Sequence, residues 1–568
     1  AINTIMLSLS EVAFEIVIPL CISGLIDYGV DKGNMSAVWK YGIILLLLAS
    51  LQYITGVFSA KCGAKAAIGF GANLRQDMYD KVQTYSFSNI DKFSTASIVT
   101  RLTTDVNNIQ NAFHQLIRMA VRSPGMMIFA MVASFRISHE ISMVFLVAIP
   151  CLAALLTFII RKVFPIFRKV FRIYDRLNNV VQENVRGIRV VKSFNQEEGE
   201  IEKFTAISGD IYENFIKGEK IISLSMPLMQ MLMNGTLLII SWLGAKAIIT
   251  SGNNPDIGLT TGNLMALISY SMLILARLMM LAIVFAQISI ATSSAQRVVE
   301  ILNEESDIQS PKNPVTEVAN GDVDFDNVSF MYASRADKKV LDNINLHFSS
   351  GQVIGILGGT GSSKSSLVQL IPRLYDATEG SVKVGGVDVR DYELTSLRDS
   401  VAMVLQKNEL FSGTIAENLR WGDENATDEE IRHACRLACA DEFIEAFPDK
   451  YDTHIEQGGT NVSGGQKQRL CIARALLKKP KVLILDDSTS AVDTKTDAAI
   501  QKSLAEYMPD TTKIIIAQRM ASVQNADKIV VMDDGKVIAV GKHDELLNTN
   551  EIYREVYLSQ QKGGELSE

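Results

Sequence analysis

The stretch from Gly355 to Ile371, GILGGTGSSKSSLVQLI, combines residue types that can bind phosphate. An apolar run at Val353–Leu357 is typical of a buried strand, and an apolar-periodic segment after Lys364 is typical of a helix. A glycine-rich turn between a strand and a helix presents backbone N–H groups and a positive helix end to an anion. Lys364 can reach the outer phosphates of a nucleotide, and the Ser365 hydroxyl can bind Mg²⁺. The stretch therefore predicts a P-loop.

One position departs from the P-loop pattern, because Ser363 stands where glycine normally precedes the lysine. An ordinary glycine-rich turn could contain the same residues, so the motifs later in the sequence must distinguish it from a P-loop. They are VSGGQ at Val462–Gln466, VLILDD at Val482–Asp487 and SAVD at Ser490–Asp493. In this order they resemble the nucleotide-binding domain of ABC transporters. The resemblance implies ATP and Mg²⁺ as cofactors.

Composition indicates a membrane protein with more than one domain. A chain of 568 residues is long for one domain, and 48% of the residues are hydrophobic. The formal net charge of −8 argues against a nucleic-acid partner. The six cysteines form no C-x-x-C pair, so we expect reduced thiols.

The first half contains six apolar segments long enough to cross a bilayer, which needs about 20 residues per helix. The segments are Ala1–Ile26, Val38–Ala60, Leu116–Phe135, Ile141–Ile160, Ile221–Ile249 and Leu264–Ile290. The long links between them carry most of the Lys and Arg, so the positive-inside rule places these links and both termini in the cytoplasm. No basic region or cleavage site precedes the first segment, so we expect no signal peptide and an N-terminus clipped within that span.

Helical periodicity continues beyond the spans, from Lys65 to Tyr85 and from Lys162 to Val191. Each pair of extensions turns at a short polar segment, Phe87–Phe93 or Ser193–Phe204. These segments resemble the coupling helices of ABC exporters, which dock on nucleotide domains; the alternative is a solvated turn. Six spans followed by one ATP domain resemble a type IV exporter half-transporter over essentially the whole chain.

The expected fold is an all-α transmembrane domain of six long helices followed by an α/β P-loop ABC ATPase domain. Ile308–Asp322 is rich in Pro, Asn and Gly, which is typical of a linker. We therefore predict a transmembrane domain at residues 1–307, a linker at 308–322 and a nucleotide-binding domain at 323–568.

The resemblance implies roles for residues of the second half. Tyr332 would stack on adenine, unless it is simply a packed strand aromatic. Gln406 would contact Mg²⁺ and sense the coupling helices, and Asp486 would be the Walker B aspartate that holds Mg²⁺. The implied nucleotide contacts are Tyr332, Gly358, Gly359, Thr360, Gly361, Ser362, Ser363, Lys364, Ser365, Ser366, Ser463, Gly464, Gly465, Gln466 and Asp493. The implied metal contacts are Ser365, Gln406 and Asp486.

Two positions of the implied catalytic set, Asp487, Gln518 and Gln406, depart from the family pattern. Asp487 replaces the glutamate that polarises the attacking water, and Gln518 replaces the switch histidine. Water positioning is geometric, and glutamine carries no titratable proton. The signature keeps Ser463 and Gly464 and changes only its leading residue, Val462. We therefore expect this chain to hydrolyse ATP poorly at its own site.

In this family two nucleotide domains sandwich two ATPs, each between one chain's P-loop and the other chain's signature. The pattern resembles the weaker half of a heterodimeric exporter in a bacterial cytoplasmic membrane. Its partner would be a second half-transporter with an intact Walker B glutamate and switch histidine. The alternatives are a homodimer with two slow sites and a non-pumping, ATP-gated regulator. Membrane lipids and an exported substrate, either drug, lipid or peptide, complete the expected partners.

Polar residues inside the spans are candidate substrate contacts: Glu11, Glu15, Gln230, Asn234 and Arg277. Charges at membrane depth are costly and usually face a bundle interior or a wet cavity. The alternative is a structural pair, with Glu11 or Glu15 bound to Arg277.

Overall fold

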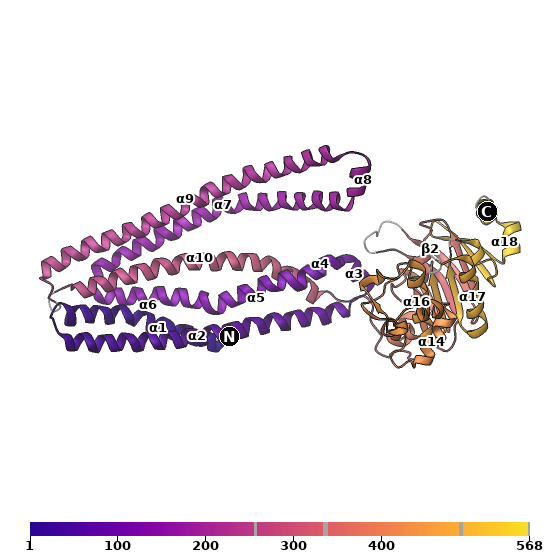
Figure 1. Cartoon of the computed structure of the whole chain (residues 1–568), viewed down its shortest axis with the longest axis horizontal. Coiled ribbons are helices and arrows are strands. Elements are labelled where there is room, and N and C mark those ends of the chain that lie inside the picture. Colours follow the sequence, from indigo (N-terminus) through magenta and orange to yellow (C-terminus); the bar gives the residue numbers. More distant parts are fainter. Residues whose placement is uncertain (255–257, 333–338, 488–491, 518, 566–568) are drawn as a thin grey trace. The chain divides into compact units, whose positions relative to one another are not determined.

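The computed structural model describes residues 1–254, 258–332, 339–487, 492–517 and 519–565 (Figure 1). The chain forms two compact units. One comprises residues 1–82 and 96–303, and the other comprises residues 83–95 and 304–568. The segment 83–95 therefore leaves the helical unit and packs with the C-terminal one. The linear domain boundaries drawn from the sequence stay a prediction.

The first unit is built from long helices, in agreement with the predicted all-α fold. They are α1 (Ile2–Leu25), α2 (Met35–Gln83), α4 (Thr95–Thr100), α5 (Val106–Gln115), α6 (Val121–Ile137), α7 (His139–Arg186), α8 (Ile188–Ser193), α9 (Glu197–Ser251) and α10 (Thr261–Asn303). Among the described residues, six helical stretches are long and apolar enough to cross a membrane. The six predicted spans are therefore confirmed in number and order.

The third span is not one regular helix. Between residues 95 and 137 it passes through α4, α5 and α6, which are joined by π-helical turns at Arg101–Asp105 and Leu116–Ala120. A π-turn inserts an extra residue and so interrupts the 3.6-residue period of the helix.

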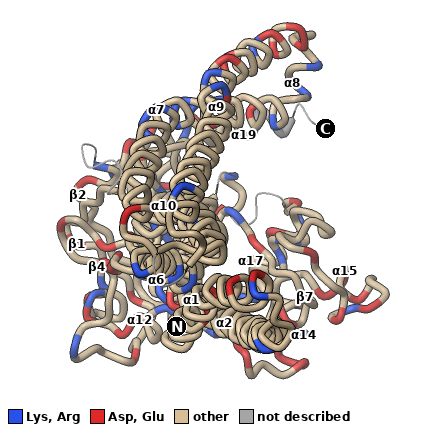
Figure 2. Tube along the Cα trace, turned by 90° about the vertical axis from the view of Figure 1, so that its left-hand side faces the viewer, with Lys and Arg blue, Asp and Glu red and all other residues tan. Residues whose placement is uncertain are grey.

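The helix pair α7 and α9 forms a hairpin closed by α8 (Figure 1). Phe167 packs its ring on that of Phe215, 5.5 Å away between centroids. Gly218 allows this approach, because a Cβ there would lie 2.8 Å from the Phe167 ring. Figure 2 shows charged residues gathered near α8, as expected for the end of the hairpin that leaves the apolar layer.

The predicted second tip segment, Ser193–Phe204, overlaps the turn between α8 and α9 only at its start. The short helix at the tip is α8, Ile188–Ser193, whereas most of Ser193–Phe204 already belongs to α9. Gly187 ends α7, and Asn195 takes a positive φ of 51° that interrupts the helix. Glu197, Glu198 and Glu200 then fall in the first turn of α9, where carboxylates stabilise the positive helix end. The polar residues of the predicted segment therefore belong mainly to the start of α9 and not to the tip helix α8.

The second unit contains the predicted α/β fold. Its strands are β1 (Val323–Phe330), β2 (Leu341–Phe348), β3 (Val353–Gly358), β4 (Glu379–Val384), β5 (Val387–Asp388), β6 (Val401–Val404), β7 (Gly413–Thr414), β8 (His454–Ile455), β9 (Val482–Asp486), β10 (Thr512–Ile516), β11 (Lys528–Asp533) and β12 (Lys536–Gly541). Its helices are α3 (Phe87–Phe93), α11 (Lys364–Gln369), α12 (Leu394–Ser400), α13 (Ile415–Arg420), α14 (Asp428–Leu437), α15 (Asp441–Glu445), α16 (Gly464–Leu477), α17 (Thr494–Tyr507), α18 (His543–Thr549) and α19 (Glu551–Glu565).

The central sheet has the strand order β12-β11-β3-β10-β9-β6, and every pair except β11–β12 is parallel. Strands β9 and β10 are buried along their whole length, as parallel sheets covered on both faces require. A second, antiparallel sheet has the order β2-β1-β4-β5. The parallel pairing brings the carboxyl ends of β3, β9 and β10 to one edge.

Helix α3, the predicted first coupling helix, docks within this unit. Ser86 caps α3 and donates to Asp307 (2.5 Å), and Ser88 donates to the other oxygen of the same carboxylate (2.8 Å). Asn89 and Lys92 both donate to Glu304, at 2.9 and 2.7 Å. The structure therefore favours docking over a solvated turn for Phe87–Phe93.

Candidate functional site

The glycine-rich turn lies at the carboxyl end of β3 and leads into α11. Ser363 adopts the left-handed conformation, with φ of 69°. Glycine reaches this region freely, whereas a residue with a Cβ is strained there by about 1 kcal/mol. The departure at Ser363 is thus a local strain and leaves the turn itself in place.

Lys364 points back over this turn. Its ammonium donates to the carbonyl oxygens of Gly358 and Gly359, both at 2.9 Å, and to the Ser362 hydroxyl at 3.2 Å. Burial lowers the pKa of Lys364 from its usual value, while the nearby carboxylates of Asp486 and Asp487 oppose that shift. A half-buried cation beside a glycine-rich turn that leads into a helix is suited to the phosphates of a nucleotide.

Two oxygen-bearing side chains that could bind a metal ion meet next to Lys364. Ser365 donates its hydroxyl to the Asp486 carboxylate (3.0 Å) at the end of β9, and Asp486 is 3% exposed. Burial raises the pKa of Asp486 above its usual range. Among the described residues there is no group of three or more His, Cys, Asp and Glu that could hold a metal alone. Mg²⁺ commonly binds through one or two protein oxygens plus phosphate, so Ser365, Asp486 and Gln406 fit Mg²⁺ held together with a nucleotide.

Asp487 follows β9 with a left-handed backbone, φ 49°, and its N–H donates to the carbonyl of Ile516 (3.0 Å). Its carboxylate lies 3.5 Å from the Gln406 amide nitrogen. The backbone is thus fixed by β10, and the side chain is one methylene shorter than glutamate would be. Its oxygens must lie nearer the sheet edge than those of a glutamate at the same position.

These residues line one cavity of about 820 Å³, within the range of about 300–1,000 Å³ usual for ligand sites. The sequence-predicted residues on its wall are Tyr332, Gly358, Gly359, Thr360, Gly361, Ser363, Lys364, Ser365, Ser366, Gln406, Asp486 and Asp487. Ser362 is buried and is absent from the lining. Gln518 lies outside the described residues, as do Ser490 and Ala491 of the SAVD motif.

Tyr332 is part of the cavity wall. Its hydroxyl shares a hydrogen bond with Ser366 (2.9 Å), and its ring meets those of Phe330 and Tyr375 edge-on, at 4.7 and 5.1 Å. The side chain is therefore both a packed aromatic and part of the cavity wall, so the two interpretations of its sequence position are compatible.

The signature residues lie elsewhere. Ser463 caps α16 and accepts from the Gln466 N–H (3.2 Å), while Gln466 accepts from the Ser463 N–H (2.9 Å). Ser463 and Gly464 are exposed, and none of Ser463, Gly464, Gly465 and Gln466 is among the described residues that line the cavity. Asp493 likewise caps α17 by accepting from the Thr496 N–H (2.9 Å).

The charges in the spans form a buried cluster. Arg122 donates to Glu11 (2.6 Å) and to Glu15 (2.7 Å), and Arg277 donates to the other oxygen of Glu15 (2.7 Å). The cluster joins α1, α6 and α10, and its formal charges cancel. The pairing of Glu15 with Arg277 agrees with the structural alternative stated above. Gln230 and Asn234 instead hydrogen-bond each other (3.3 Å) on an exposed face of α9.

Sequence reasoning missed Arg122 and the cavity wall supplied by α19. Arg122 lies inside the predicted third span, Leu116–Phe135, and was as visible there as Arg277 was in the sixth. Ile552, Val556 and Gln560 of α19 line the cavity at four-residue spacing, and Gln560 accepts from the Met520 N–H (2.8 Å). The four-residue spacing of these side chains is visible in the sequence. The sequence does not show that this face of the helix packs over the cavity.

Two family models match the chain. The one described as "ABC transporter transmembrane region" matches residues 1–279, and the one described as "ABC transporter" matches residues 341–490. A Bacillus subtilis protein named as an ABC transporter ATP-binding protein, YfiB, is 35% identical over 98% of this chain and 95% of its own length. The ATP-dependent lipid A-core flippase of Pseudoalteromonas translucida is 30% identical over 93% of this chain and 90% of its own length.

A solved structure has the same fold. It is described as a bacterial Atm1-family ABC exporter with ATP bound, and it matches with a TM-score of 0.81 over 98% of this chain and 97% of its own. The sequence identity is 23%, so this likeness concerns the fold.

Replacing Arg122 by Met should strongly destabilise the helical unit, because it leaves Glu11 buried without its partner. Breaking a buried pair from one side costs about 3–5 kcal/mol. The matched control is Arg176→Met, which breaks the exposed pair with Asp210 and should cost about 0–1 kcal/mol. Unfolding of the full chain in lipid nanodiscs measures both, and equal losses of stability would show that the cluster does not brace the spans.

Proposed function

Because the chain belongs to the ABC transporters and combines their transmembrane region with their ATPase domain, we propose that it is one half of a dimeric exporter. It binds ATP with Mg²⁺ and couples ATP hydrolysis to transport. The proposed assembly lies in the bacterial cytoplasmic membrane, with both termini and the ATPase domain in the cytoplasm. The proposed domains are residues 1–307, the linker 308–322, and residues 323–568.

The observation that carries the two-chain proposal is the separation of the signature from the cavity. Ser463 and Gly464 are exposed at the start of α16, and the described cavity wall does not include them. A capped helix start that presents a hydroxyl and backbone N–H groups is suited to an anion. The γ-phosphate that it meets would therefore belong to ATP held by another chain.

The roles inside the cavity follow from the contacts. Tyr332 would hold the adenine, Lys364 and the turn would hold the phosphates, and Ser365, Asp486 and Gln406 would hold Mg²⁺. Bound Mg²⁺ supplies positive charge that neutralises the transferred phosphoryl group. Asp493 would lie at the interface between the two ATPase domains.

Hydrolysis at this site would be slow, because the group that must orient the attacking water is Asp487. Its backbone is fixed by Ile516, so the side chain cannot move outward to replace the missing methylene. A displacement of about 1 Å can cost about a hundredfold in rate. Gln518 adds a second departure. We therefore propose that the working hydrolytic site is formed by the partner's P-loop and this chain's signature.

The substrate path would use the exposed polar pair of α9, Gln230 and Asn234, while Glu11, Glu15 and Arg277 brace the helices. A homodimer with two slow sites is the alternative assembly, and a non-pumping regulator is the alternative activity. Vectorial transport into inside-out vesicles separates a pump from a regulator. Purification of the chain with and without the product of a neighbouring half-transporter gene separates the two assemblies.

The test of the asymmetric function is nucleotide trapping during turnover. This chain's site should retain ATP while ADP forms at the other site, because Lys364 and Ser365 bind nucleotide and Asp487 and Gln518 hydrolyse it poorly. Site-specific photolabelling followed by nucleotide identification measures the two occupancies. Equal ADP in both sites would contradict the proposal.

Asp487→Glu should raise hydrolysis at this site, but by less than the roughly hundredfold that full water positioning is worth, because Gln518 remains. Single-turnover hydrolysis is measured in the complex whose partner P-loop lysine has been replaced. Asp487→Asn is the matched control, which keeps the shape and removes the base. A rate for Asp487→Glu equal to that of the partner's own site would show that Gln518 has no effect.

A substitution in the signature should lower ATP turnover more than a substitution of Asp487, the residue after the Walker B aspartate. Ser463→Arg adds a long charged side chain where two domains close on a phosphate, so steady-state ATPase should collapse. Asp487→Asn should leave most of it intact. Both variants are measured in the same assembled complex. If Asp487→Asn is the more damaging, this chain owns the working site and the asymmetry is reversed.

A further inference from the structure

Tyr375 lies between the nucleotide cavity and the docked helix α3. Its ring meets three others, those of Tyr332 (5.1 Å, perpendicular), Phe330 (5.6 Å) and Phe87 (6.0 Å). Its hydroxyl donates to the Asp91 carboxylate (2.8 Å). Phe87 and Asp91 belong to α3, whereas Tyr332 belongs to the cavity wall, so one side chain contacts both.

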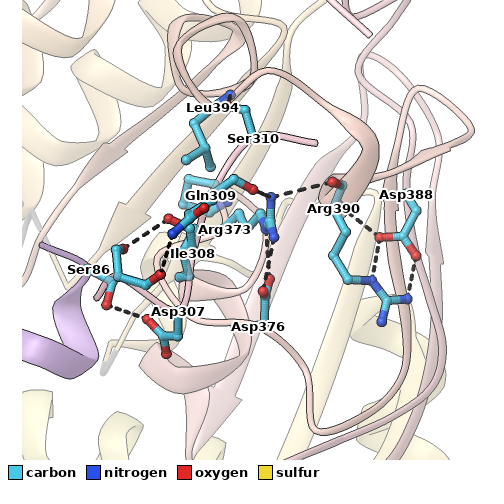
Figure 3. A network of polar contacts seen from close by, with 12 residues as sticks. Ser86, Asp307, Ile308, Gln309, Ser310, Arg373, Asp376, Asp388, Arg390 and Leu394 are labelled. Atoms are coloured by element: carbon cyan, nitrogen blue, oxygen red, sulfur yellow. Dashed lines mark hydrogen bonds and ion pairs between the residues drawn. The ribbon is translucent and has the colours of Figure 1, made fainter. Parts of the chain in front are cut away.

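Helix α3 is also anchored on one short segment, residues 304–307. Ser86 and Ser88 bind Asp307, and Asn89 and Lys92 bind Glu304. The Ser86–Asp307 contact and the polar chain that continues through Gln309 and Arg373 are shown in Figure 3. Arg373 is buried and also binds Asp376 through two nitrogens (2.8 and 3.1 Å). This bidentate pair holds the backbone on both sides of Tyr375.

On the cavity side, Tyr332 is held by its hydroxyl bond to Ser366 and by its edge contact to Tyr375. A base stacked on the face of Tyr332 must fix the orientation of that ring. Edge-to-face aromatic pairs depend on orientation, so fixing one ring favours one position of the other. The hydrogen bond from the Tyr375 hydroxyl to Asp91 would then carry that position to α3.

We propose that Tyr375 is a positioning residue that links occupancy of the adenine pocket to the docking of α3, so that the nucleotide base strengthens the docked state independently of hydrolysis. This inference rests on the proposed contact of Tyr332 with adenine. A site that retains ATP would therefore keep α3 docked for as long as the nucleotide stays bound.

The test compares ATP with inorganic tripolyphosphate, which carries the phosphates and lacks the base. Hydrogen–deuterium exchange of the α3 amides is followed in the full chain, in the assembly in which it purifies, with Mg²⁺ and no turnover. ATP should slow the exchange of α3 by about two- to tenfold, the effect of one oriented aromatic pair. Tripolyphosphate, at saturation, should leave the exchange rate unchanged.

Two variants separate the ring from the hydroxyl. Tyr375→Leu should bind ATP, with Lys364 and the turn intact, and lose the slowing of exchange. Tyr375→Phe keeps the ring and loses the Asp91 bond, so the slowing should fall in part. Asp91→Asn keeps an acceptor oxygen and should behave like the unchanged protein, whereas Asp91→Ala should behave like Tyr375→Phe. Tyr507→Leu is the matched control, because it removes an edge contact to His433 far along the chain.

The outcomes distinguish this inference from the proposed function. Equal slowing by ATP and tripolyphosphate, or full slowing in Tyr375→Leu, overturns the role of Tyr375. Tyr332→Ala should weaken ATP binding without changing tripolyphosphate binding; if ATP binding is unchanged, the adenine contact itself is wrong. Loss of the slowing in Tyr507→Leu would show a general loosening of the unit and would also overturn the inference.

Discussion

The parallel pairing of β3, β10 and β9 is the interaction on which the ATPase unit depends. Ile516 aligns with Ile356 on one side and with Asp486 on the other, so the turn after β3 and the carboxylates after β9 share one edge. Motifs separated by more than a hundred residues become neighbours through this register alone. A slip of one residue would turn Asp486 away from Ser365, because side chains alternate between faces along a strand.

The sequence was most informative where chemistry requires particular residues at fixed spacing. The P-loop with its flanking strand and helix, the six apolar spans and the docking of Phe87–Phe93 could all be predicted. The tip helix α8 could not, because acidic residues that start α9 look like a polar turn. Arg122 and Tyr375 were missed for different reasons. Arg122 is a charged residue inside a predicted span and was as visible there as Arg277. Tyr375 contacts segments that are distant in the sequence, and no local pattern predicts such contacts.

The cluster of Glu11, Glu15, Arg122 and Arg277 shows how a span bundle can contain carboxylate and guanidinium side chains. Each carboxylate has a guanidinium partner, so no net charge faces the apolar surroundings. The Glu11 oxygen and the Arg122 Nε that lack hydrogen-bond partners mark where the packing is least satisfied. Such a cluster fixes which helix faces meet, since any rotation of α1 would separate Glu15 from both arginines.

The capping box at Ser463 has a consequence for an anion that meets the start of α16. The hydroxyl accepts a hydrogen bond from Gln466, and a hydroxyl has a proton to donate as well as lone pairs to accept. Binding an incoming phosphate therefore breaks no bond of the cap. Because this hydrogen bond already fixes the Ser463 rotamer in the folded chain, binding an anion there costs no further side-chain entropy. In the proposed dimer this helix start would therefore meet the γ-phosphate without rearranging, and domain motion would govern closure.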